Sequence, residues 1–248
     1  LSLVIPKNSN KVITVKGDIT LFDAGALSNS THKLALLVDK GSAAESVTAK
    51  GASSGTSITG TALDYSATDA DQSANTATVY KTKITVAYAS DTPAGAASPS
   101  ASQVIAKINV TNSANAGNYS ATVMNMNFVI SSSDIDTLTA ARALTIYKDS
   151  LSTAAIATTN YAIGQLYSNS AMTAANFNSN TGVEIAAGTT KLFIVTLDTT
   201  EVSSTKSLSV NVAASTSATT GIRWSDDGGT NTYTGVDTLP LLSKTFTY

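Results

Sequence analysis

Few side chains in this sequence could carry out catalytic chemistry. The chain has one histidine, His32, and no cysteine. A cysteine nucleophile and a cysteine zinc site are therefore excluded, and a Ser-His-Asp triad would have to use His32. No nearby pattern supplies this histidine with a nucleophile and an orienting acid. We interpret His32 as a surface residue.

One acidic pair has the residue types of a cation site. Asp226 and Asp227 follow Trp224 and precede two glycines. Calcium prefers several carboxylate and carbonyl oxygens at a sharp turn. The rest of a calcium loop, with acids at alternate positions and a distal glutamate, is absent. Asp226 and Asp227 therefore predict either part of a calcium site or a polar hairpin loop, and no other cofactor is expected.

A sugar-cleaving cleft is a further possibility to weigh. It needs two carboxylates in a cleft and aromatic rings that stack on the sugar. Aromatic residues make up 6% of the chain, and Trp224 is the only tryptophan. We interpret Trp224 as a core anchor and expect that the protein is not an enzyme.

Three asparagines match the N-glycosylation pattern Asn-x-Ser/Thr: Asn29, Asn109 and Asn118. Such matches also arise by chance in a chain this rich in Asn, Ser and Thr. Glycosylation and chance therefore both stay open for these sites.

The composition indicates a charge-poor polypeptide of small residues. Ala, Ser and Thr make up 108 of the 248 residues, charged residues are 13%, and the net charge is −2. Basic residues are scattered, so we expect no nucleic-acid partner. No apolar run approaches the roughly 20 residues of a membrane-spanning helix. The sequence begins at Leu1 and not at Met, and we expect a processed or excised segment.

The apolar residues repeat with a period of two, which predicts strands. The runs are rich in Val, Ile, Thr, Tyr and Phe and are separated by turn clusters. The clearest are 33–38, 84–88, 103–110, 119–130, 143–147, 192–197, 208–212 and 245–248. Residues 134–143 and 170–176 are candidates for short helical turns. The fold class is therefore all-β, with Ig-like β-sandwich domains.

An internal repeat predicts the domain organisation. Residues 5–18 align with 185–198, 30–38 with 204–212, 47–51 with 222–226, and 79–86 with 241–248. Residues 1–82 therefore correspond to the second half of a repeat, and residues 83–248 to a complete copy. We expect a partial sandwich followed by a complete one.

An incomplete sandwich exposes sheet edges, which proteins normally cover. A strand from a neighbouring copy could cover them, and a head-to-tail contact of this kind produces a filament or layer. We predict contact residues at both termini: Leu1, Leu3 and Ile5 at one end, and Phe246 and Tyr248 at the other. Alternatively, the sequence is a fragment of a longer tandem array.

Several segments resemble tandem Ig-like repeat surface proteins of uncultivated Parcubacteria-type bacteria. They are Val47-Thr-Ala-Lys-Gly-Ala-Ser-Ser-Gly-Thr-Ser, Val79-Tyr-Lys-Thr-Lys-Ile-Thr-Val, Ile185-Ala-Ala-Gly-Thr-Thr-Lys-Leu-Phe-Ile-Val-Thr-Leu-Asp-Thr-Thr, and Ile222-Arg-Trp-Ser-Asp with Leu239-Pro-Leu. The usual Pro-Val and Gly-Gly of the last segment are replaced by Pro240-Leu241 and Leu242-Ser243. The resemblance implies an S-layer or fibre role, and it carries no ligand and no enzyme activity.

The sequence thus predicts a non-catalytic, extracellular, cell-surface structural subunit that forms a homopolymer. The alternative is an adhesin or carbohydrate-binding module that binds surface glycans and depends on calcium. Exposed aromatic side chains near Trp224 and a calcium ion at Asp226 and Asp227 would favour the alternative. A buried Trp224 would count against it.

Overall fold

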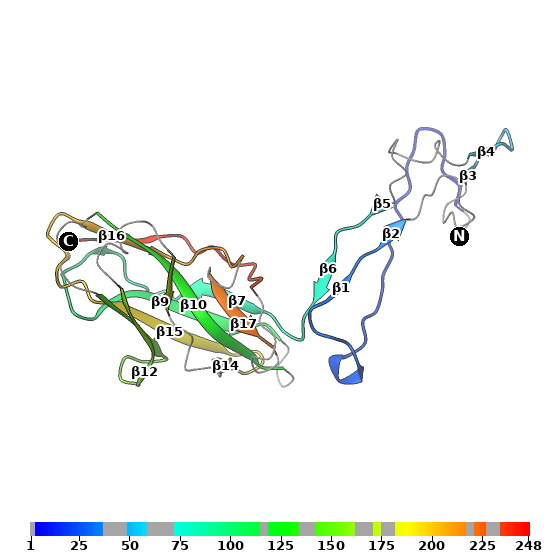
Figure 1. The fold of residues 1–248 in the computed structure, drawn as a ribbon. Coiled ribbons are helices and arrows are strands. Elements are labelled where there is room, and N and C mark those ends of the chain that lie inside the picture. The colour runs from blue at the N-terminus through cyan, green and yellow to red at the C-terminus, as the bar shows by residue number, and fades with distance from the viewer. Residues whose placement is uncertain are drawn as a thin grey trace. The chain divides into compact units, whose positions relative to one another are not determined.

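The structure is a computed structural model, and it describes residues 3–36, 49–58, 72–114, 119–133, 142–161, 171–174, 182–216, 221–226 and 234–248. The chain divides into two compact units, Leu1–Tyr80 and Lys81–Tyr248, which we describe separately (Figure 1).

The fold is all-β, as the sequence predicted. In the described part of the chain there is no α-helix, only the short 3-10 turn η1 (Phe22–Ala24). Accordingly, no described helix is long and apolar enough to cross a membrane. Most of the first predicted helical turn, residues 134–141, lies outside the described residues. The second prediction is wrong, because Ala171–Ala174 form a strand.

The second unit contains a five-stranded antiparallel sheet in the order β12-β11-β15-β9-β7. Its strands are β7 (Ile84–Tyr88), β9 (Gln103–Asn112), β11 (Arg142–Lys148), β12 (Ala155–Tyr161) and β15 (Thr190–Leu197). The central strand β15 pairs with β9 on one edge and with β11 on the other. Ile108, Phe193 and Lys148 occupy one cross-strand row, so their side chains share one face of the sheet.

The other sheet of this unit has seven strands built around β10. The path is β13-β10-β16-β18-β8, and β14 and β17 also pair with β10. The strands are β8 (Gly95–Ala96), β10 (Ala121–Ser132), β13 (Ala171–Ala174), β14 (Val183–Ile185), β16 (Ser207–Asn211), β17 (Ile222–Ser225) and β18 (Lys244–Thr247). Every pair is antiparallel except β18 with β8, which is parallel.

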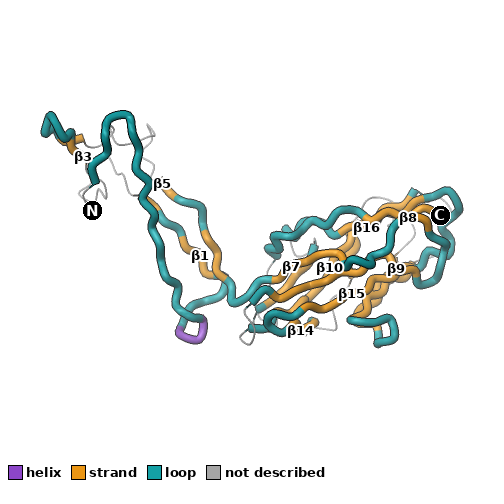
Figure 2. Tube along the Cα trace, turned by 180° about the vertical axis from the view of Figure 1, so that it is seen from behind, coloured by secondary structure: helices purple, strands orange, loops and turns teal. Residues whose placement is uncertain are grey.

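Strand β10 is flanked on each edge by two short strands in line. Met126 pairs with Ala174 of β13 on one edge and with Ile222 of β17 on the other. On the edge occupied by β13, β14 pairs with residues 121–123 near the start of β10. On the edge occupied by β17, β16 pairs with residues 129–132 near its end. Because both edges are occupied, the backbone of β10 is paired along most of its length. Figures 1 and 2 show β10 running across the second unit.

The core of the second unit lies between the two packed sheets, which gives a sandwich-like architecture. Alternate residues of both sheets point inward, and the largest fully buried side chains come from both of them. From the β10 sheet these are Phe128, Trp224 and Phe246, and from the β15 sheet Ile108 and Phe193.

Asn112 links the ends of the two sheets. Its side chain is fully buried, and its Nδ2 donates to the carbonyl oxygens of Tyr119 at 2.8 Å and Ile185 at 3.0 Å. Its Oδ1 accepts from the Thr82 hydroxyl and from the backbone N–H of Ala114. A buried amide satisfied on both atoms holds these segments in one arrangement.

The first unit contains only short strand pairs among its described residues. They are β1 (Ser30–His32) with β6 (Ala77–Val79), β2 (Ala35–Leu36) with β5 (Gln72–Ser73), and β3 (Ala49–Lys50) with β4 (Ser57–Ile58). The first two pairs follow each other along one two-stranded ribbon (Figure 2). Residues 79–86, aligned above with the last strand of the repeat, divide between β6 and β7. An isolated two-stranded ribbon is marginal in water.

Candidate assembly surface

The first unit exposes its large apolar side chains. None of its residues whose burial the structure describes is buried. The described chain has thirteen exposed large apolar side chains, and eleven of them lie in this unit: Leu3, Val4, Ile5, Val12, Ile13, Val15, Ile19, Leu21, Leu27, Leu34 and Ile58. The other two are Leu151 and Leu242. Large exposed apolar patches are typical of interaction sites, so the first unit is the candidate for one.

Four of these exposed side chains, Val12, Ile13, Val15 and Ile19, lie in one segment, residues 10–20. Val12 is 87% exposed and Val15 63%. Within the described part of the chain, no hydrogen bond reaches these eleven residues, and they belong to no strand. An extended backbone with free N–H and C=O groups is ready to pair with another strand.

A groove runs along this segment inside the first unit. Its volume is about 780 Å³, and it is lined by residues 15–20, by Leu27 and Leu34, and by residues of the β1–β6 ribbon. The apolar side chains that line it are themselves exposed. The groove and the free backbone beside it together form the candidate assembly surface.

The predicted N-terminal contact residues lie in the same unit but do not line the groove. Leu3 and Ile5 are 44% and 54% exposed and lie in no strand, whereas Leu1 is outside the described residues. These two side chains are therefore available for a contact.

The predicted C-terminal contact residues lie in the second unit and already make contacts within it. Phe246 is 2% exposed and pairs with Leu208 of β16 on one edge and with Gly95 of β8 on the other. The Tyr248 hydroxyl donates to Gln103 Oε1 at 2.6 Å, and its N–H donates to the Lys206 carbonyl at 3.0 Å. This differs from the expectation of a free C-terminal strand, because β18 forms its pairs within its own unit.

Two tyrosines near this strand have perturbed acidity. Burial raises the pKa of Tyr88 to about 12, and Lys244 Nζ lies 5.0 Å from the centre of its ring. Burial also raises the pKa of Tyr248, while its hydrogen bonds to Thr199 and Gln103 act in the opposite direction. Burial makes both phenols harder to ionise because a buried tyrosinate would lose its hydration.

The predicted calcium ligand Asp226 has a structural role. Its side chain is 5% exposed, and its Oδ2 accepts a 3.0 Å hydrogen bond from the backbone N–H of Lys81. Asp227 lies outside the described residues. Elsewhere in the described ranges, no group of three His, Cys, Asp or Glu side chains could hold a metal ion. The carboxylate of Asp226 thus fixes the first residue of the second unit.

Trp224 is a core residue, as the sequence analysis interpreted it. It is fully buried on β17, opposite Val123, and its Nε1 donates to the Gly235 carbonyl at 3.3 Å. A ring in this position cannot stack on a sugar. Trp224 therefore does not supply the exposed aromatic side chain that would favour a carbohydrate-binding module.

The remaining predicted residues lie on exposed or half-exposed positions. Asn29 is exposed in a turn, with φ of 63°, and Asn109 is half-buried on β9. Asn118 is outside the described residues. His32 is exposed on β1, where its Nε2 lies 3.2 Å from the Ser30 hydroxyl. No hydrogen bond or ion pair joins Asn29, Asn109 and His32 in the described part of the chain.

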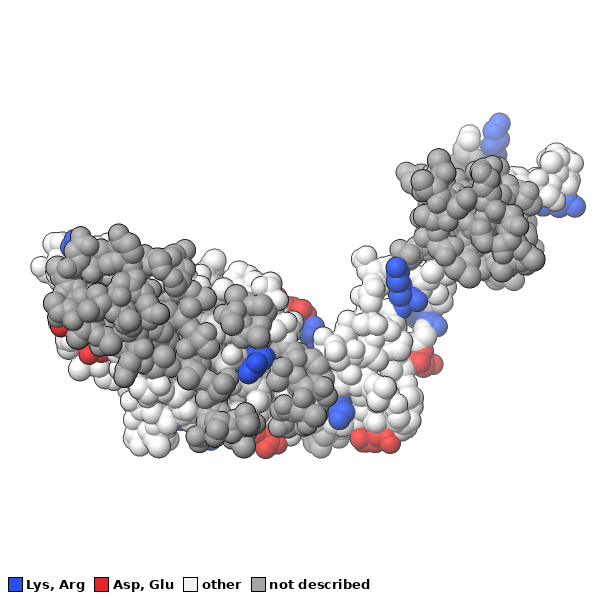
Figure 3. All heavy atoms as spheres, in the orientation of Figure 1, with Lys and Arg blue, Asp and Glu red and all other residues white. Residues whose placement is uncertain are grey.

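Charged side chains are sparse on the face drawn in Figure 3. Several Lys or Arg side chains lie together on the first unit, and the other charged side chains on this face are scattered among uncharged residues. Ion pairs such as Lys107–Asp91 are local, and the pKa of Asp91 is lowered mainly by its hydrogen bond from Lys107.

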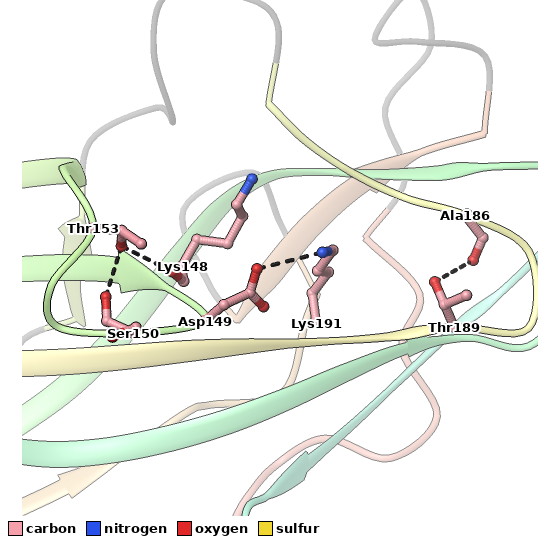
Figure 4. Close-up of polar contacts among 7 residues, drawn as sticks. All are labelled: Lys148, Asp149, Ser150, Thr153, Ala186, Thr189 and Lys191. Carbon is pink, nitrogen blue, oxygen red and sulfur yellow. Dashed lines mark hydrogen bonds and ion pairs between the residues drawn. The ribbon is translucent and has the colours of Figure 1, made fainter.

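Polar contacts at one end of the β15 sheet stabilise turns (Figure 4). Thr153 Oγ1 donates to the carbonyl oxygens of Lys148 at 2.9 Å and Ser150 at 2.6 Å. Lys191 Nζ lies 3.3 Å from Asp149 Oδ2, with both side chains more than a third exposed. Thr189 closes a second turn by donating to the Ala186 carbonyl. An exposed ion pair of this kind contributes little to stability. The hydroxyl groups of Thr153 and Thr189 are what hold the two turns.

Nothing in the sequence pattern singles out Ile19, Leu21, Leu27 and Leu34 as contact residues. Their apolar character was visible, but their exposure depends on which strands cover them. The free backbone of residues 10–20 was likewise not foreseen. Its alternation of Val and Ile with Thr and Lys predicts a paired strand and does not reveal the lack of a partner.

Comparisons of the chain with known protein families, with curated proteins and with solved structures give no match.

Proposed function

We propose that this protein is a non-catalytic, extracellular structural subunit that self-assembles into a cell-surface filament or layer. Its domains are Ig-like sandwiches, and neighbouring copies complete one another by strand complementation. One observation carries the proposal: the first unit buries none of the residues whose burial is described, whereas the second has a full core. A unit without a core gains stability when a partner covers its apolar side chains.

The internal repeat supports the same conclusion. Residues 10–18 align with 190–198, and in the second unit Thr190–Leu197 form β15, between β9 and β11. Within the described residues of the first unit, the aligned segment has no such neighbours. The strands that would flank it come, on this proposal, from another copy of the chain.

The resemblance to tandem-repeat surface proteins is consistent with this role. The alternative, a calcium-dependent adhesin, has no specific observation in its favour, because Trp224 is buried and Asp226 holds a backbone N–H. We therefore propose the structural role alone.

The assembly state of the full chain tests the proposal. Sedimentation velocity and negative-stain electron microscopy are expected to show concentration-dependent polymers. Leu27→Asp with Leu34→Asp should reduce the polymer fraction, since both side chains line the groove of the first unit. The matched control is Leu151→Asp with Leu242→Asp, two exposed apolar side chains of the second unit.

The control pair should leave the polymer fraction unchanged. A wild-type chain that stays monomeric at all accessible concentrations would overturn the proposal. Equal losses in both double variants would show that the first unit has no special part in assembly.

A further inference from the structure

The exposed segment of the first unit is complementary to itself in the antiparallel direction. Read outward from Gly17, the chain places Lys16 against Asp18, Val15 against Ile19, Thr14 against Thr20 and Ile13 against Leu21. The next two positions place the apolar Val12 against Phe22 and the basic Lys11 against the acidic Asp23. Each charge thus meets its opposite, each threonine a threonine, and each apolar side chain another apolar one.

This pattern fits two copies of the segment paired about a twofold axis. In an antiparallel pair whose axis passes through Gly17, each residue lies opposite the one just named, and the two Gly17 residues face each other. Opposite charges and apolar pairs directly across the strands stabilise such a ribbon. Every favourable contact occurs twice by symmetry.

The pairing would also separate apolar from polar side chains. Alternate residues of a strand point to opposite faces. Ile13, Val15, Ile19 and Leu21 share one face with Gly17, and Thr14, Lys16, Asp18 and Thr20 share the other. Two copies would therefore form a ribbon with one wholly apolar face.

The structure leaves this segment available for such a contact. Residues 10–20 accept and donate no hydrogen bond within the described part of the chain, and Ile13, Val15, Ile19 and Leu21 are all exposed. Leu21 still has an extended backbone, with φ −63° and ψ 149°, and η1 begins at Phe22. The Leu21 carbonyl accepts hydrogen bonds from the N–H groups of Ala24 and Ala26, so the backbone without hydrogen bonds ends at Thr20 in the described structure.

A hairpin within one chain would make the same residue pairs, but the structure does not fold the segment in this way. Gly17 is not among the residues with positive φ, and no cross-strand hydrogen bond joins its two sides in the described structure. Because the two sides of Gly17 do not pair with each other in the described structure, each side is open to pairing with a second strand.

We propose that residues 13–21 of two copies of this chain pair as antiparallel strands about a twofold axis at Gly17. The occupant of this edge is thus a second copy of the same segment. This contact deepens the proposed function and rests on it, because it names one of the interfaces by which copies meet. A twofold contact alone closes a dimer, so polymers need a second, different interface.

Single-cysteine variants of the full chain test the register, because the natural chain has no cysteine. A Cβ at Gly17 would meet nothing within 4 Å in the isolated chain, so Gly17→Cys is sterically tolerated. The pairing places two such Cα atoms within disulfide range, about 4.5–5.5 Å apart. Mild oxidation is expected to give a covalent dimer on a non-reducing gel.

Two matched variants come from the same segment. Thr14→Cys alone and Thr20→Cys alone should cross-link about tenfold more slowly than Gly17→Cys, because each lies opposite the other and far from its own copy. An equimolar mixture of the two variants should recover rapid dimer formation. Lys16→Asp or Asp18→Lys in the Gly17→Cys background should slow cross-linking, and the double charge exchange should restore it.

Equal cross-linking of Gly17→Cys, Thr14→Cys and Thr20→Cys would overturn the inference, since it would indicate random collision. An intrachain disulfide in a chain carrying both Thr14→Cys and Thr20→Cys would overturn it in favour of a hairpin. A chain that polymerises while Gly17→Cys fails to cross-link would overturn this contact and leave the proposed function standing. A monomeric chain would remove both.

Discussion

Gly182 and Gly221 lie beside opposite edges of β10, each directly before a short strand that pairs with it. Gly182 precedes β14 and Gly221 precedes β17, with φ of 61° and 60°. A Cβ on Gly182 would lie 2.6 Å from the Val123 carbonyl oxygen, and one on Gly221 would lie 2.8 Å from the Ala213 carbonyl oxygen. Both positions require glycine for conformation and for space.

We predict that Gly182→Ala and Gly221→Ala each lower the free energy of unfolding by about 1–3 kcal/mol. Urea unfolding of the full chain, followed by Trp224 fluorescence, measures the change. Gly95→Ala tests the effect of backbone conformation without a steric clash, because Gly95 has φ of 89° and nothing within 4 Å of an added Cβ. Gly235→Ala, with open space and no positive φ, should change little. A Gly182→Ala variant as stable as Gly235→Ala would contradict the prediction.

Replacement of Asn112 should destabilise the second unit. Asn112→Ala leaves the buried carbonyls of Tyr119 and Ile185 without their donor, and we expect a loss of about 2–4 kcal/mol. Asn109→Ala, on the opposite face of the same strand, is the matched control and should stay within about 0.5 kcal/mol of the wild type. Thermal and urea unfolding measure both.

Asn112→Asp adds a pH test of the same site. A carboxylate there would face two carbonyl oxygens, and only its protonated form could donate to one of them. The folded state would therefore hold the proton more tightly than the unfolded state, so stability should rise as the pH falls. A variant whose stability is independent of pH between neutral and acid conditions would contradict this account.

Trp224 should behave as a buried reporter. We expect blue-shifted emission and weak quenching by acrylamide in the native state, because the ring is fully buried. Trp224→Ala should cost about 3–5 kcal/mol, and Trp224→Phe less. Oligosaccharides should leave the emission unchanged. Red-shifted native emission, or a saturable response to a sugar, would return the carbohydrate-binding alternative to consideration.

Stability should fall in strongly alkaline solution as Tyr88 ionises. Its pKa is raised to about 12 by burial, so the folded state favours the neutral phenol. The corresponding stability is complete below the unfolded value of about 10 and is lost as the pH rises toward 12. Tyrosinate absorbance of the wild type minus Tyr88→Phe should show a step near the upper value. A step near the ordinary tyrosine value would contradict the assigned burial.

Local alternation let the sequence predict eight of the eighteen described strands, including the long strands β9, β10 and β15. Residues 84–88 form β7 as predicted, and the predicted run 192–197 lies within β15. Alternating Val, Ile, Thr and Tyr determine an extended, half-buried backbone through interactions between near neighbours. The strands β12 and β13 were missed, because Ala155–Tyr161 and Ala171–Ala174 consist mainly of small residues without a clear apolar face.

Only the tertiary structure decided which strands pair and therefore which apolar residues are covered. Phe246 and Ile13 have the same alternating surroundings in the sequence, yet Phe246 is buried between β16 and β8 and Ile13 is 58% exposed. Pairing joins residues far apart in the chain, such as Phe246 with Leu208 and Gly95, and local sequence does not specify it. The sequence by itself determined that the chain is a β protein, and the long-range hydrogen bonds decided that its second unit has a core while the described residues of its first unit stay exposed.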